Sequence, residues 1–128
     1  MIDHIGLAVS NMERSKAFYV DALKPLGIAI VMEVTAEQTG ADAHAGFGKD
    51  DKAFFWIGGG AKPKGGTHVA FTAPTRTDVD AFYHAALAAG GRDNGPPGLR
   101  PHYHPDYYGA FVFDPDGNNI EAACHRPG

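Results

Sequence analysis

The sequence contains one cysteine, Cys124, and lacks both a run of basic residues and a long apolar stretch. A single cysteine cannot form an internal disulfide, so we expect a cytoplasmic protein in which Cys124 is a small buried residue. The net charge of −4 offers no basic surface for nucleic acid. The apolar stretches fall far short of the roughly 20 residues that a membrane-spanning helix needs. We therefore expect neither nucleic acid nor a membrane as a partner.

The residues that are present are typical of a globular protein. Apolar residues make up 44% and charged residues 20% of the 128 positions, which fits one domain over residues 1–128. The 17 glycines and 9 prolines indicate many tight turns between short elements.

An internal repeat organises the chain. A shift of 64 positions places His4 on His68, and it matches identical residues along a strand, a helix and the glycine after the helix. A shift of 65 then aligns the segment that ends in Trp56 with the segment that ends in Glu121, because one extra loop residue costs little. We predict two copies of one folding unit, module 1 over about residues 1–60 and module 2 over about residues 65–125.

Each copy shows the same succession of patterns. Period-two alternation predicts a first strand, and a capped stripe of apolar residues then predicts a helix that ends at a glycine. Asn11 caps the first helix, and Thr75 or Thr77 caps the second. Further strands are predicted over 28–34, 44–47 and 52–57 in module 1, and over 107–113 and 118–124 in module 2. The fold class is α+β, with two tandem βαβββ modules that form a curled mixed sheet around a cup for a metal or ligand.

Three residues on the face away from the helices suggest a metal site. His4, His68 and Glu121 come from three different strands. Two neutral imidazoles and a carboxylate can hold a divalent ion and leave positions open for water and substrate. Any one of the three alone is better explained as a hydrogen-bonded polar residue. The three together, two of them related by the repeat, favour the metal.

The strands around both histidines and the ending Asp114-Pro115-Asp116-Gly117-Asn118-Asn119-Ile120-Glu121 resemble the glyoxalase, bleomycin-resistance and extradiol-dioxygenase group, the vicinal oxygen chelate superfamily. The resemblance places His4, His68 and Glu121 on three metal-ligand positions, with iron, zinc, nickel and manganese all open. It implies a divalent-metal-dependent enzyme that acts on a small oxygenated molecule, either a glyoxalase-like lyase or isomerase, or a dioxygenase. The alternative is a non-catalytic protein of the bleomycin-resistance type, which binds and sequesters a small molecule. Two-module members commonly form dimers, so the resemblance also implies a homodimer.

Trp56 departs from the pattern of glyoxalase I, which has a carboxylate ligand on this strand. An indole can neither bind a metal nor take a proton from carbon, which argues against glyoxalase I activity itself. Two readings of Trp56 stay open. It stacks, with Phe54 nearby, on a flat ligand, or it fills the cup as a large apolar side chain.

The segment 100–108 concentrates groups that titrate or donate hydrogen bonds. We expect it at the mouth of the cup, where His102 or His104 would serve as general acid or base. Tyr103 or Tyr107 would steady an oxyanion, and Arg100 would contact substrate. The alternative is a surface loop without a function. His44, on a strand, His84, on a helix face, and His125, in a frayed end, are not expected in the site.

Overall fold

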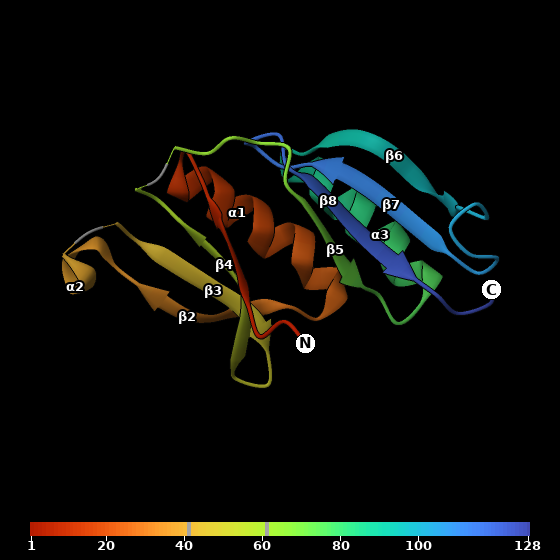
Figure 1. Ribbon diagram of the computed structural model, residues 1–128, viewed down its shortest axis with the longest axis horizontal. Helices are drawn as coiled ribbons and strands as arrows, with labels where there is room; N and C mark the ends of the chain where they lie inside the picture. The colour runs from red at the N-terminus through yellow and green to blue at the C-terminus, as the bar shows by residue number, and fades with distance from the viewer. Residues whose placement is uncertain (41, 61) are drawn as a thin grey trace.

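The computed structural model describes residues 1–40, 42–60 and 62–128. Two four-stranded mixed sheets lie side by side, each with a long helix packed against it (Figure 1). The strand orders are β1-β4-β3-β2 in one sheet and β5-β8-β7-β6 in the other, and the two sheets do not close into a barrel within the described residues. The predicted α+β fold of two tandem βαβββ modules is confirmed.

The elements of module 1 are β1 (Ile5–Ala8), α1 (Met12–Leu23), a short 3-10 helix (Lys24–Leu26), β2 (Ala29–Val34), α2 (Ala36–Thr39), β3 (His44–Lys49) and β4 (Lys52–Gly58). Module 2 contains β5 (His68–Thr72), α3 (Arg76–Ala88), β6 (Arg92–Leu99), β7 (Tyr108–Phe113) and β8 (Asn119–Cys124). In each module the first strand pairs in parallel with the last, and the other pairs are antiparallel.

The two long helices begin at positions that the repeat aligns, and each has the same kind of N-terminal cap. The side chain of Asn11 accepts a hydrogen bond from the amide of Arg14 at 3.1 Å. The side chain of Thr75, 64 positions later, accepts one from the amide of Asp78, also at 3.1 Å. Each cap satisfies an amide that has no partner within its own helix, and this fixes the residue at which the helix begins.

Two elements have no clear signal in the local sequence. The four-residue helix α2 is held by a capping box between Thr35 and Gln38 and is too short to show a helical period. Strand β6 contains Pro96 and Pro97, which lack amide donors. It is an edge strand, and its register with β7 shifts on both sides of Gly95, so the prolines are tolerated there. β6 supplies the strand that the repeat requires of module 2.

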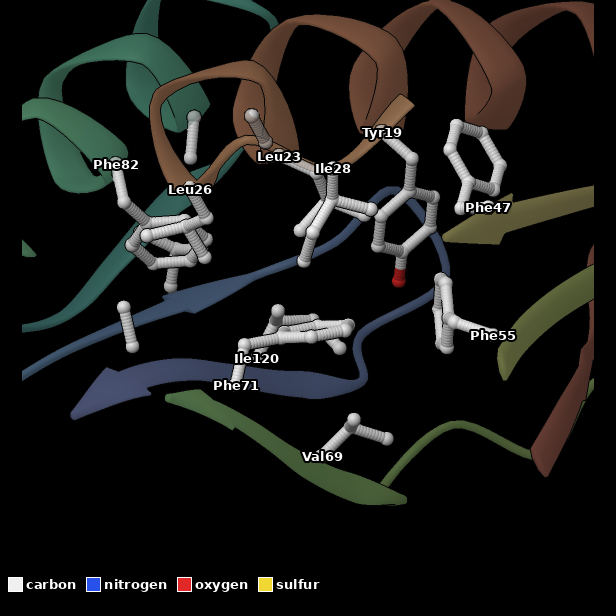
Figure 2. Packing of buried hydrophobic residues seen from close by; sticks show 14 of the residues in the cluster. Tyr19, Leu23, Leu26, Ile28, Phe47, Phe55, Val69, Phe71, Phe82 and Ile120 are labelled. Atoms are coloured by element: carbon white, nitrogen blue, oxygen red, sulfur yellow. The ribbon is translucent and has the colours of Figure 1, made fainter. Parts of the chain in front are cut away.

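One apolar core joins the modules. The helices α1 and α3 pack together, and the rings of Phe55 and Phe71, one from each module, meet edge to face at 5.2 Å (Figure 2). Cys124 is a free thiol buried at the end of β8, as predicted. No helix within the described ranges is long and apolar enough to cross a membrane.

The turn between β7 and β8 fastens module 2 to module 1. The buried carboxylate of Asp114 accepts hydrogen bonds from the hydroxyl of Tyr19 at 2.5 Å and from the amide of Asn118 at 2.8 Å. It also accepts from the side chain of Asn118 at 3.0 Å and from the amide of Asp116 at 2.9 Å. Asp116 in turn accepts from the amide of Ser10 at 3.2 Å. The hydrogen bonds of residues 114–118 therefore hold the two modules together.

Candidate functional site

His68 and Glu121 lie together on the open face of the second sheet. They come from the adjacent parallel strands β5 and β8, and His68 Nε2 is 3.1 Å from Glu121 Oε1. The side chain of His68 is 48% exposed, whereas that of Glu121 is 2% exposed. Tyr107, just before β7, donates a hydrogen bond from its hydroxyl to Glu121 Oε2. A buried carboxylate thus presents one oxygen to an imidazole that reaches solvent.

The hydrogen bonds of His68 determine which of its ring nitrogens carries a proton. Nδ1 is 3.0 Å from the main-chain oxygen of Asn119, which can only accept, so Nδ1 is the donor. In a neutral ring Nε2 then carries a lone pair, and this lone pair faces Glu121 Oε1, which is also an acceptor. A neutral ring and an ionised carboxylate would thus place two acceptors 3.1 Å apart, and either a proton between Nε2 and Oε1 or a cation bound to both atoms can join them.

Tyr107 holds the other oxygen of Glu121. Burial raises the pKa of the Tyr107 hydroxyl far above its ordinary value, and the hydrogen bond to Glu121 and the charge of that carboxylate raise it further. The hydroxyl therefore stays protonated and keeps donating. The site accommodates this contact because residue 109 is glycine: a Cβ there would lie 3.1 Å from Glu121 Oε2.

A stack of side chains supports His68 from the side. The ring of Phe111 is inclined by 27° to the imidazole, with the ring centroids 6.2 Å apart. The guanidinium of Arg100 covers Phe111 at 5.4 Å and donates to the main-chain oxygen of Pro96 at 2.7 Å. Arg100 is thus placed one ring away from His68.

The loop that precedes β7 forms a chain of aromatic contacts that leads to Tyr107. The ring of His102 packs on Tyr103, with ring centroids 4.2 Å apart, and Tyr103 meets Tyr107 edge to face at 5.1 Å. His104 Nδ1 accepts from the amide of Asp106 at 3.1 Å, so this histidine stabilises the turn. Of the loop residues that we predicted as catalytic, Tyr107 contacts Glu121, whereas His102 and His104 are exposed.

His125 was not expected in the site, yet its ring contacts Tyr107 edge to face at 4.9 Å. It follows β8 directly, and it also approaches His104, with the ring centroids 6.1 Å apart. His125 is exposed and lies outside the strand, but its ring rests against this loop.

His4 belongs to the open face of the first sheet, just before β1. Its Nδ1 is 2.7 Å from the carboxylate of Asp3, which also forms an ion pair with Lys52 at 2.7 Å. The hydrogen bond from Lys52, and then that from His4, lower the pKa of the Asp3 carboxyl. An imidazole whose Nδ1 donates to a carboxylate presents its Nε2 lone pair outward, as metal-bound histidines commonly do.

Trp56 and His4 border a cavity of about 450 Å³ together with Gly6, Val34 and His44. Phe54 borders a different hollow, of about 320 Å³, that runs from Ile2 and Ile5 to strand β5. The two aromatic residues predicted to contact a ligand therefore border different cavities.

The strand registers place Trp56 where module 2 has Glu121. Trp56 pairs with Gly6 on β1 and with Gly46 on β3. Glu121 pairs with Ala70 and Phe111, the residues that the repeat aligns with those two glycines. A Cβ at residue 46 would lie 2.9 Å from the indole, so the glycine makes room for the ring.

His44 is a residue of this face that the sequence reasoning missed. Its Nδ1 lies 2.9 Å from the main-chain oxygen of Asp42, so Nδ1 is again the donor and Nε2 carries the lone pair of a neutral ring. The ring lies on Gly58, where a Cβ would approach it to 2.2 Å. The period-two alternation of β3 could have revealed His44, because it shares the face of Gly46, opposite Trp56.

A comparison with protein families decides the relationship. The model of the Glyoxalase/Bleomycin resistance protein/Dioxygenase superfamily matches residues 1–122. The chain belongs to this superfamily. Glyoxalase I, fosfomycin resistance enzymes and dioxygenases are among its members.

Solved structures of the superfamily share the fold. A glyoxalase/bleomycin resistance protein from Albidiferax ferrireducens T118 is 28% identical, with 95% of this chain and 97% of that chain covered and a TM-score of 0.78. A glyoxalase I mutant from Zea mays is 21% identical, with 95% and 46% covered and a TM-score of 0.73. A fosfomycin resistance protein from Listeria monocytogenes, complexed with Mn(II) and sulfate, is 17% identical, with 97% and 91% covered and a TM-score of 0.68. Comparison with curated protein sequences gives no match.

This superfamily member brings two of its three predicted metal ligands together in one chain. His68 and Glu121 are neighbours, whereas His4 lies in the other module beside Asp3. Over residues 1–40, 42–60 and 62–128, no three His, Cys, Asp or Glu side chains gather closely enough to hold a metal ion. A single chain therefore places two of the predicted ligands on one sheet and the third, His4, on the other.

Proposed function

We propose that the protein is a divalent-metal-dependent enzyme that acts on a small oxygenated molecule, as a glyoxalase-like lyase or isomerase, or as a dioxygenase. The observation that carries the proposal is the contact of His68 Nε2 with Glu121 Oε1 at 3.1 Å. Both atoms are acceptors when the ring is neutral, and a divalent cation bound to both removes the conflict between them. The ligand geometry is prepared in advance, because Asn119 anchors Nδ1 and Tyr107 anchors Oε2.

The third ligand, on this proposal, comes from a second copy of the chain. His4 and His68 are equivalent positions of the two modules, and both present Nε2 on the open face of a sheet. A two-fold dimer that lays the first sheet of one copy on the second sheet of the other would bring His4 to His68 and Glu121. Such a homodimer contains two identical sites.

The proposed metal is iron, zinc, nickel or manganese. It would polarise oxygens of the substrate as a Lewis acid. The protein's own contribution is to position the ligands and line the site. Trp56 and His44 border the cavity beside His4, so on this proposal they would contact the substrate bound there. In the proposed dimer, Trp56 and His44 of one copy would face Glu121 of the other copy.

Elemental analysis of untagged protein, saturated with each metal and desalted, tests the proposal. Wild type is expected to retain roughly one ion per chain, whereas Glu121→Gln and His68→Ala retain almost none. His84→Gln, on the exposed face of α3, is the matched control and should retain the wild-type amount. Equal metal content in wild type and Glu121→Gln would contradict metal dependence.

A second candidate is a protein that binds and sequesters a small molecule without catalysis. The cavity beside Trp56 favours it, because an indole face and two imidazoles suit a flat ligand. Trp56 is the only tryptophan, so quenching of its fluorescence reports binding there directly. Ligand affinity that is the same in metal-loaded and metal-stripped protein supports this candidate, whereas affinity that requires the metal supports the enzyme.

A further inference from the structure

A third cavity, distinct from the hollow beside Phe54 and also of about 320 Å³, opens at the ends of β5 and β8, next to the Lys49 end of β3 in module 1. Basic side chains dominate its rim: Lys49 at the end of β3, and His125 and Arg126 after β8. Thr72, Ala73, Pro74 and Ala123 form the rest of the lining. No residue that we predicted for the metal site borders this cavity.

Three basic side chains border this cavity in a chain whose net charge is −4. In the described part of the chain, no carboxylate lies within ion-pair distance of Lys49, His125 or Arg126. Basic groups that converge on a cavity without acidic partners create a positive potential that attracts an anion from solution.

The cavity is a close neighbour of Glu121. Thr72 pairs with Ala123, and two residues back along the same strands Ala70 pairs with Glu121. Two residues of a strand span about 7 Å, and both pairs lie on the same face. His125 on the rim contacts the ring of Tyr107, whose hydroxyl is bonded to Glu121. An anion in the cavity would therefore lie within one small molecule's length of the proposed metal ligands.

We infer that this cavity binds the carboxylate or phosphate group of a small anionic molecule. Arg126 offers a planar pair of donors, Lys49 a point charge and Thr72 a hydroxyl donor, a combination that suits an oxyanion. The proposal of an anion site depends only on these three side chains. Its use as a substrate subsite, which would make the substrate an organic acid or a phosphate ester, rests on the proposed function.

The test measures anion binding in metal-free protein, so that it is independent of the proposed metal chemistry. Protein stripped of metal and then desalted is titrated with inorganic phosphate, with acetate and with chloride at constant ionic strength, and amide NMR shifts are followed. Phosphate or acetate is expected to saturate shifts at Thr72, Ala73 and His125, and the tighter of the two identifies the group. Lys49→Gln and Arg126→Gln should each weaken binding by about tenfold, as expected for loss of a charge-assisted contact. Lys64→Gln, outside the cavity, should not.

Three results would overturn the inference: chloride produces the same shifts, the shifts fall elsewhere on the chain, or Lys64→Gln weakens binding as much as Lys49→Gln. A failure to retain metal, by contrast, would contradict only the proposed function. The variants replace exposed side chains, and their amide spectra report directly whether the fold is kept.

Discussion

Asp114 and Glu121 are both buried carboxylates of module 2, and a tyrosine hydroxyl donates to each. Their remaining partners differ. Asp114 accepts three further hydrogen bonds, from Asp116 and Asn118, which together with Tyr19 fill its oxygens. Glu121 has an oxygen whose only close partner in the described residues is the His68 ring. The first carboxylate is saturated and structural, and the second retains capacity for a ligand.

Tyr19→Phe is expected to lower the free energy of unfolding by about 1.5–3 kcal/mol, because it removes a donor from a buried carboxylate. Urea unfolding at neutral pH measures the change. Tyr83→Phe, which removes a hydroxyl bonded to Asp93 in an exposed contact, is the matched control and should leave the midpoint unchanged. A Tyr19→Phe variant as stable as this control would show that Asp114 does not need the hydroxyl.

Stability at alkaline pH should depend on the same tyrosine. Burial, and then the Asp114 charge, raise the pKa of Tyr19 well above its ordinary value. Unfolded tyrosines lose their protons from about pH 10, whereas the folded side chain keeps its proton, so the stability it contributes is lost as pH rises above that value. Urea unfolding between neutral pH and pH 11 should show this fall, and the fall should be shallower in Tyr19→Phe. Equal slopes would contradict it.

In the strands, positions that the repeat aligns carry a large side chain in one module and a small one in the other. Module 1 has Trp56 opposite Gly46, and module 2 has Glu121 opposite Phe111. Likewise His44 faces Gly58, whereas Gly109 faces Ala123. The same backbone therefore carries an indole and an imidazole on one sheet and a tyrosine-bonded carboxylate on the other.

Gly46→Ala is expected to destabilise the protein by about 1–3 kcal/mol, because the new Cβ would lie 2.9 Å from the Trp56 ring and from Ala53 Cβ. The emission maximum of Trp56 should shift as the ring is displaced. Gly6→Ala is the control, since its Cβ would make only ordinary contacts at 3.8 Å and the equivalent residue of module 2 is already alanine. An unchanged emission in Gly46→Ala would mean that the indole does not rest on residue 46.

The repeat explains how much of this structure could be predicted. It predicted the module order, both helix caps and the alignment of Trp56 with Glu121, because hydrophobic periods and capping residues act locally. It could not reveal β6, whose prolines hide the strand pattern, or the contact of His125 with Tyr107, which depends on tertiary packing. The separation of His4 from Glu121 was also hidden, since a sequence repeat does not state how two sheets face each other.

At the scale of the whole molecule, the open sheets leave the proposed metal ligands divided between two faces. Mixing two inactive variants tests whether these faces meet in a dimer. Neither His4→Ala nor Glu121→Gln alone should retain metal. A mixed dimer, however, would combine His4 of one copy with His68 and Glu121 of the other in one complete site. After random exchange, metal content should recover to about a quarter of wild type.

Elemental analysis after co-refolding and desalting measures this recovery. The control mixes His68→Ala with Glu121→Gln, which lie on the same face and cannot complement each other in this arrangement. No recovery in the first mixture, despite mixed dimers in native mass spectrometry, would contradict a shared site.

The proline pair of β6 has a consequence for how copies of the chain associate. An outer strand normally exposes amides that can recruit a strand from another molecule, the first step of edge-to-edge aggregation. Pro96 and Pro97 have no amide hydrogens, and the shifted register around Gly95 interrupts the edge further. This margin of the second sheet is therefore a poor template for sheet extension. The prolines do not affect association through the broad open faces, so the β6 margin favours contacts between faces over extension of the sheet.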